Sequence, residues 1–91
     1  VGVGDVDFAQ SIRLFPNPAK HVANIDYSFE DSRNLMITVT NAVGQVVYQQ
    51  EAPQGQRARV ELDLSNYSNG VYFVQFNDGE NQLTRRLVVN K

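Results

Sequence analysis

Cysteine is absent from all 91 residues of the chain. The protein therefore has no disulfide framework, no thiolate nucleophile and no thiolate metal site. Tryptophan is absent as well, which weakens the case for a flat sugar-binding platform. Lys and Arg number 8 against 10 Asp and Glu, so the net charge of −2 offers no basic excess for a nucleic-acid partner. No run approaches the roughly 18 consecutive apolar residues of a membrane helix.

The length and composition are those of one small soluble domain. With 91 residues the chain buries only roughly 60–65% of its unfolded surface, so nearly every apolar side chain is needed inside. Hydrophobic residues make up 42% and charged residues 20%, ordinary values for a globular fold. The chain begins with Val1 rather than Met, so we expect further residues before it, and we expect Lys91 to be the natural C-terminus. Residues 1–11 are assigned to a linker and residues 12–91 to the domain.

The hydrophobic pattern has a period of two, which is typical of strands, and no segment has a convincing helical period. The clearest alternation covers residues 57–64, where one face is apolar and the other charged. Pro16-Asn17-Pro18 predicts a stiff corner, and Gly44 predicts a hairpin turn with a positive φ. Seven short strands joined by turns indicate a single immunoglobulin-like antiparallel β-sandwich. They are expected at residues 12–15, 21–29, 34–40, 45–51, 57–64, 70–76 and 82–89.

The strand at 70–76 lacks strict alternation, so we expect it to be a central strand buried on both faces. Gly70 and Tyr72 at its start resemble a tyrosine corner, in which the hydroxyl bonds back to the preceding loop. A generic core strand would have a similar pattern, and both interpretations stay open. The aromatic residues divide into an expected core set of Tyr27, Phe29, Phe73 and Phe76 and two expected surface residues, Tyr48 and Tyr67.

Candidate chemistry is sparse. His21 is the only histidine, and a triad with Ser65 or Ser68 lacks any nucleophile-elbow pattern, so a surface histidine is favoured. The run Asp78–Asn81 offers oxygen ligands for calcium but is far shorter than a dedicated loop, and a solvated turn is favoured. We expect no enzyme activity, cofactor or metal. The arginines at 57, 59, 85 and 86 would form a basic patch only if their strands shared a surface, and solvated strand faces are favoured.

Five runs follow one another in order along nearly the whole chain: Leu14–Lys20, Val39–Val47, Leu62–Ser65, Gly70–Val74 and Leu87–Lys91. Together they resemble the C-terminal sorting domains of the type IX secretion system. Their most characteristic residues are Pro16, Asn17, Pro18, Gly44, Gly70 and Tyr72. Two departures are small: Thr40-Asn41 stands where an aspartate is common, and Tyr67 where leucine is frequent.

The resemblance implies a folded secretion signal carried by an N-terminal cargo protein. The signal would direct the cargo through the periplasm and across the outer membrane by the type IX translocon, to the cell surface or the medium. A surface sortase would then remove the domain by cleavage within residues 1–11 and join the cargo to lipopolysaccharide. The alternative, from another class, is a fibronectin-like accessory or carbohydrate-binding module that a secreted enzyme retains.

The last strand is the expected recognition element of such a signal, through strand addition at a sheet edge or through its outward side chains. The alternative is that these residues only close the sandwich. A weak dimer through an exposed edge strand is a further expectation. The recognition residues suggested for the translocon are Arg85, Arg86, Leu87, Val88, Val89 and Lys91.

Overall fold

The computed structural model describes residues 10–52 and 55–91, apart from the side chains of residues 30–33 and 55–56. The predicted linker and cleavage region therefore lie outside the described residues over positions 1–9. Within the described part, no helix is long and apolar enough to cross a membrane. Seven strands are present: β1 (Ile12–Phe15), β2 (Val22–Arg33), β3 (Met36–Thr40), β4 (Val46–Glu51), β5 (Gly55–Asp63), β6 (Gly70–Asn77) and β7 (Gln82–Val89).

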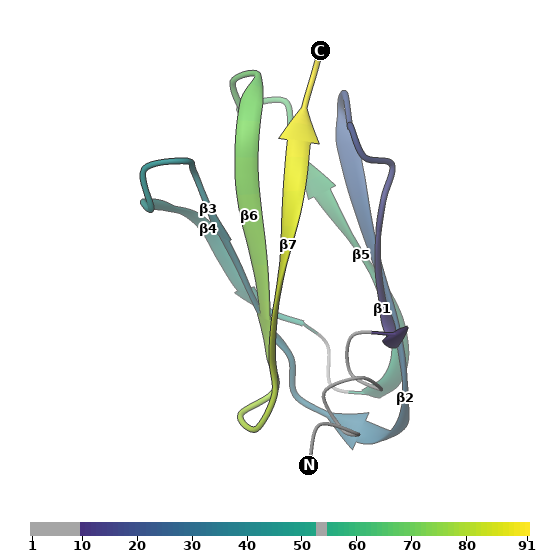
Figure 1. Ribbon diagram of the computed structural model, residues 1–91. Helices are drawn as coiled ribbons and strands as arrows, with labels where there is room; N and C mark the ends of the chain where they lie inside the picture. The colour runs from purple at the N-terminus through teal and green to yellow at the C-terminus, as the bar shows by residue number, and fades with distance from the viewer. Residues whose placement is uncertain (1–9, 53–54) are drawn as a thin grey trace.

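The strands form two antiparallel sheets that face each other (Figure 1). The three-stranded sheet has the order β1-β2-β5, and the four-stranded sheet has the order β4-β3-β6-β7. Strands β1 and β7 thus lie at the edges of different sheets. The β-sandwich expected from the sequence is confirmed. Its strands start and end within two residues of the predicted positions, except that β2 continues to Arg33, four residues beyond its predicted end.

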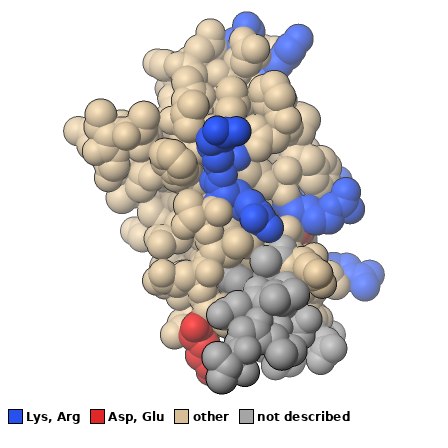
Figure 2. All heavy atoms as spheres, viewed as in Figure 1, with Lys and Arg blue, Asp and Glu red and all other residues tan. Residues whose placement is uncertain are grey.

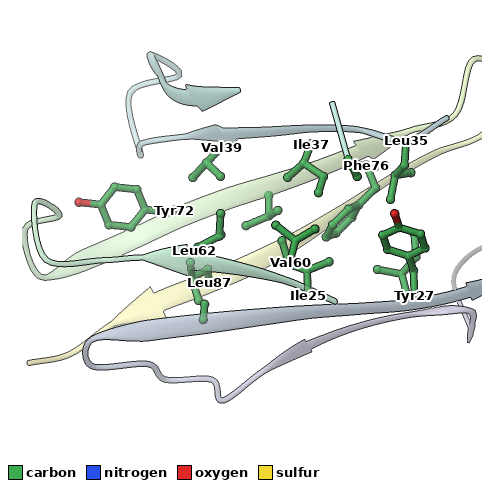
Figure 3. Close-up of a cluster of buried hydrophobic side chains, with 14 of the residues drawn as sticks. Ile25, Tyr27, Leu35, Ile37, Val39, Val60, Leu62, Tyr72, Phe76 and Leu87 are labelled. Carbon is green, nitrogen blue, oxygen red and sulfur yellow. The ribbon is translucent and has the colours of Figure 1, made fainter. Parts of the chain in front are cut away.

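The core lies between the sheets and follows from the alternation of apolar residues (Figure 3). In the three-stranded sheet, Ile25 lies opposite Leu14 and Val60, and all three side chains point inward. In the four-stranded sheet, Ile37 and Phe76 form an inward pair and are fully buried. Because directly opposed residues share a face, each register places a row of side chains in the core and the next row in solvent.

The prediction that β6 is buried on both faces is wrong. Tyr72, Val74 and Phe76 are buried, whereas Val71 and Phe73 are 37% and 38% exposed. The assignment of Phe73 to the core is therefore also wrong. A sandwich has only two layers, so even a strand at the centre of its sheet has one face toward solvent. The high apolar content of β6 reflects an apolar outer face rather than a second core.

The two tyrosines expected at the surface are in fact half-buried. Tyr48 and Tyr67 pack against the hydrophobic core. Burial raises the pKa of Tyr67 above its ordinary value. Its ring lies 5.0 Å from the ring of Tyr72, centroid to centroid. Neither tyrosine is available as a flat, open sugar platform.

Candidate recognition surface

The last strand, β7, is an edge strand that pairs with β6 alone among the described strands. Leu87 and Val89 lie on its inner side and are buried in the core. Two of the six residues suggested by the sequence for recognition therefore have side chains that a partner of the folded domain does not reach. Arg85 and Arg86 are both exposed but lie on opposite faces, since Arg85 is paired with the buried Val74 and Arg86 with the exposed Phe73.

The corner Pro16-Asn17-Pro18 lies against the backbone of β7, although the two segments are far apart in sequence. The Asn17 side-chain amide donates to the carbonyl oxygen of Arg86 at 2.7 Å. Its carbonyl oxygen accepts a hydrogen bond from the backbone N–H of Val88 at 3.1 Å. One asparagine side chain therefore satisfies two backbone groups on the outer edge of β7, as a neighbouring strand would.

Ala19, the residue after this corner, also binds the outer backbone edge of β7. It forms a parallel bridge with Val89, in which its N–H donates to the carbonyl oxygen of Val88 at 2.8 Å. The N–H of Asn90 donates in turn to the carbonyl oxygen of Ala19 at 2.9 Å. The chain thus pairs with one sheet through β1 and then touches the other beyond the corner. Strand addition to β7 is blocked from Arg86 to Asn90.

Lys91 is held by the loop between β5 and β6. Its backbone N–H donates to the side-chain oxygen of Asn69 at 2.9 Å, and its ammonium donates to the carbonyl oxygen of Ser65 at 3.1 Å. The neighbouring Asp63 carboxylate accepts a hydrogen bond from the Ser65 N–H at 3.0 Å. This bond, aided by the positive charge of Lys91, lowers the pKa of Asp63. The C-terminal residue is therefore anchored, with its side chain exposed.

Two further motif residues, Gly70 and Tyr72, build a tyrosine corner. The Tyr72 hydroxyl donates to the carbonyl oxygen of Ser68 at 2.8 Å, in the loop just before the strand. Gly70 has a φ of 150°, which favours glycine over residues with a side chain. Of the two interpretations left open by the sequence, a tyrosine corner and a generic core strand, this hydrogen bond favours the tyrosine corner. The tyrosine corner holds the turn that leads into β6, and β6 is the strand with which β7 pairs.

The hairpin between β3 and β4 also has the predicted chemistry. Gly44 has a φ of 89°, and its N–H donates to the carbonyl oxygen of Asn41 at 3.0 Å. The side-chain oxygen of Asn41 accepts from the N–H groups of Val43 and Gln45, at 3.1 and 2.9 Å. An aspartate could accept the same two bonds. The departure from the family pattern at this position therefore preserves the turn.

The outer face of the three-stranded sheet is charged. Asp26 lies between Arg13 and Arg59 in one cross-strand row, and the Arg59 guanidinium bonds both Asp26 oxygens at 3.2 Å. This hydrogen-bonded ion pair lowers the pKa of Asp26. Both guanidiniums lie over the ring of Phe15, at 5.4 and 5.3 Å from its centroid. Arg57 shares this surface, whereas Arg85 and Arg86 belong to the other sheet.

The residues considered for catalysis or calcium binding have local structural roles. His21 is exposed, and its carbonyl oxygen accepts the N–H of Leu64 at 2.9 Å. One carboxylate oxygen of Asp78 accepts the N–H groups of Glu80 and Asn81, at 2.9 and 2.6 Å, as in a stabilised turn. In the part of the chain that the structure describes, no group of three or more His, Asp or Glu residues is placed to hold a metal ion.

The outward residues of β6 are the part of the surface that the sequence did not reveal. Phe73 lies between Thr40 of β3 and Arg86 of β7, and Val71 lies opposite Val88. An alternating apolar pattern marks an inward face only when the intervening residues are polar. Here both faces of β6 are apolar, so the pattern alone could not show which one points to solvent.

Comparison with known proteins agrees with this architecture. Residues 13–90 match the model of a family described as the secretion system C-terminal sorting domain. A solved DUF3244 family protein from Bacteroides vulgatus, with an immunoglobulin-like β-sandwich fold, is similar with a TM-score of 0.73. Its sequence is 22% identical, and the alignment covers 88% of this chain and 85% of that one, a likeness that concerns the fold alone. No functionally curated protein gave a significant match.

Proposed function

Because the chain belongs to the secretion system C-terminal sorting domains, the export signals of the type IX system, we propose that it carries an N-terminal cargo protein across the outer membrane and is then removed. The cargo is thereby destined for the cell surface or the medium. In this proposal the translocon recognises the folded domain after the cargo has reached the periplasm. A surface sortase cleaves within residues 1–11 and joins the cargo to lipopolysaccharide. The domain itself catalyses no reaction.

The match over residues 13–90 carries this proposal, because it coincides with the whole sandwich from β1 to β7. A signal used by unrelated cargo proteins cannot borrow a core from its neighbour. The sandwich meets this requirement, since the buried residues of both sheets form one continuous cluster. The domain can therefore keep the same surface whatever protein precedes it.

For recognition we propose the accessible residues of the last strand and the chain end, namely Arg85, Arg86, Val88 and Lys91. Leu87 and Val89 act indirectly in this proposal, because their burial holds β7 on the sandwich. Charge reversal at Arg85 and at Arg86 tests the electrostatic part, since both side chains are exposed. Normal secretion of both variants would exclude an electrostatic contribution.

The function is tested by fusing residues 1–91 to the C-terminus of a fluorescent reporter that carries a signal peptide. The fusion is expressed in a host with the type IX machinery, and the reporter is located and its mass measured. Surface or medium localisation, with a mass loss close to the 10.2 kDa of the domain, is the expected result. Retention of an intact, folded fusion in the periplasm would contradict the proposal. Retention of that kind would favour the accessory-module alternative, which glycan affinity gels then test.

We propose β4 as the edge through which a weak dimer forms, since β7 is covered from Arg86 to Asn90. The N–H of Ala52 donates to the carbonyl oxygen of Leu35, so in the regular part of β4 the outward backbone groups belong to Gln49 and Glu51. These groups would pair with a second copy. Sedimentation of Gln49→Pro, which removes one outward N–H, is expected to shift the protein toward monomer. A wild-type chain that is already monomeric at high concentration would exclude the dimer.

A further inference from the structure

We propose that the machinery docks on the outer face of the four-stranded sheet, with Val71 and Phe73 as its apolar contacts and Arg86 as its charged contact. The inference rests on the proposed function and narrows it to one surface. The partner is a protein surface that is mainly apolar and carries a carboxylate opposite Arg86. Val71 and Phe73 lie on β6, the neighbour of the last strand.

The distribution of exposed apolar side chains singles out this face. Seven large hydrophobic residues are exposed among those described, and six of them belong to the four-stranded sheet or its β3–β4 hairpin. Only Val22 belongs to the other sheet. Such an asymmetry is not required for folding, because the core is already closed on the inner faces. The six are Met36, Val43, Val46, Val47, Val71 and Phe73.

The register brings the key residues of this face together. Phe73 has Thr40 on one side and Arg86 on the other, and Thr40 has Val46 as its second neighbour. In the adjacent row toward the chain end, Val71 lies beside Val88. Directly opposed residues of neighbouring antiparallel strands have Cβ atoms about 4.5–5.5 Å apart. Phe73 therefore lies in a row that runs from Val46 through Thr40 to the guanidinium of Arg86, with the apolar pair Val71 and Val88 beside it.

The outer face of the four-stranded sheet also has fewer charged side chains than the outer face of the three-stranded sheet. The three-stranded sheet carries a dense set of acidic and basic side chains on its outer face, which suits contact with water. The strands β3, β4, β6 and β7 together carry only Glu51, Arg85 and Arg86 as charged residues, and of these Arg85 lies on the inner side. On the side visible in Figure 2, the part of the surface at the β3–β4 hairpin shows neither basic nor acidic side chains.

Charge complementarity identifies the chemistry of the partner. Arg86 is exposed and, within the described residues, forms no ion pair. Its cross-strand neighbour is the ring of Phe73 rather than a carboxylate. Interface centres are depleted in charge and enriched in aromatic residues and arginine. An aromatic ring beside one unpaired guanidinium thus fits a protein partner with a single acidic group in an apolar patch.

The experiment uses the reporter fusion with Phe73→Thr, Val71→Thr and Arg86→Glu, together with Arg57→Glu as a control. Arg57 lies on the outer face of the opposite sheet and undergoes the same charge change as Arg86. Threonine keeps the strand preference at both apolar positions and removes only apolar contact. We expect each of the first three variants to lower the surface-to-periplasm ratio about tenfold, which corresponds to a loss of about 1.4 kcal/mol of binding free energy, with no change for Arg57→Glu.

The other outcomes distinguish the possible failures. If wild type and all variants are secreted equally, docking on this face is wrong while the proposed function stands. If the wild-type fusion is not secreted, the proposed function fails and this inference fails with it. Thermal unfolding of the purified 1–91 variants shows whether a secretion defect comes from a lost contact or from an unfolded domain. If Phe73→Thr does not fold, the secretion of Val71→Thr tests the docking surface instead. If the variants instead dissociate a dimer in sedimentation, the occupant is a second copy and the assignment of the partner is overturned.

Discussion

Replacing Asn17 with alanine tests whether the corner before Ala19 fastens β7 to the rest of the domain. The substitution removes the bond to the Arg86 carbonyl oxygen at 2.7 Å and the bond from the Val88 N–H at 3.1 Å. Asn17 is exposed, so water replaces both partners and no buried polar group is left unpaired. The backbone of the corner is still set by its two prolines.

The expected cost follows from these two bonds. A hydrogen bond contributes a net of about 0.5–1.5 kcal/mol, and exposed bonds belong to the lower half of that range. Asn17→Ala is therefore expected to destabilise the domain by about 1–2 kcal/mol. For a domain of this size each kcal/mol lowers the melting temperature by about 4–8 °C. Asn17→Asp keeps an acceptor for Val88 but has no donor for Arg86 at neutral pH, so it is also expected to be less stable than wild type.

Urea unfolding and hydrogen exchange of the Val88 amide measure the two parts of the effect. We expect a lower urea midpoint with an unchanged slope, and faster exchange at Val88, because its N–H then faces water at a sheet edge. Asn66→Ala is a matched control, since Asn66 is exposed and its side chain makes no hydrogen bond with the described residues. Wild-type stability together with unchanged exchange at Val88 in Asn17→Ala would refute the role of the corner.

Three further expectations concern the core, the tyrosine corner and pH. Leu62→Ala is expected to cost about 2–5 kcal/mol in chemical unfolding, because Leu62 is buried in the core; a cost below 1 kcal/mol would contradict its place there. Tyr72→Phe should lower the free energy of unfolding by about 1 kcal/mol. Tyr48→Phe loses only an exposed hydrogen bond to Gln50 and should lower it clearly less. Equal costs for the two variants would contradict the tyrosine corner. The pKa of Asp26 is lowered by its bond to Arg59, so its stabilisation is present above about pH 4 and is lost as the pH falls through its folded pKa. Asp26→Asn should accordingly flatten the fall in stability between about pH 5 and pH 2, and an unchanged profile would contradict this.

Strand positions were predictable because burial on one face imposes a period of two. The alternation around Leu62 located β5, and glycine at position 44 located a turn that needs a positive φ. The burial of β6 was predicted wrongly, because Val71 and Phe73 extend its apolar pattern to both faces. No local pattern states whether a third layer covers a sheet.

The recognition surface was only partly predictable for a related reason. The sequence pointed to the last strand but gave no way to separate Arg85 from Arg86, which lie on opposite faces. Leu87 and Val89 were expected to be contact residues, although both are buried. The face on which each β7 side chain lies depends on the register with β6. That register is set by the pairing of the two strands and cannot be read from either strand alone.

The sequence by itself determined the fold class, the turns and the family, because these depend on local patterning, turn residues and motifs in order. The tertiary structure alone decided that Asn17 and Ala19 cover the edge of β7, a contact between residues about 70 positions apart in sequence. It also decided that Phe73 and Arg86 are neighbours on an outer face. Both results come from the pairing of distant segments, which is fixed by closing one core between two sheets.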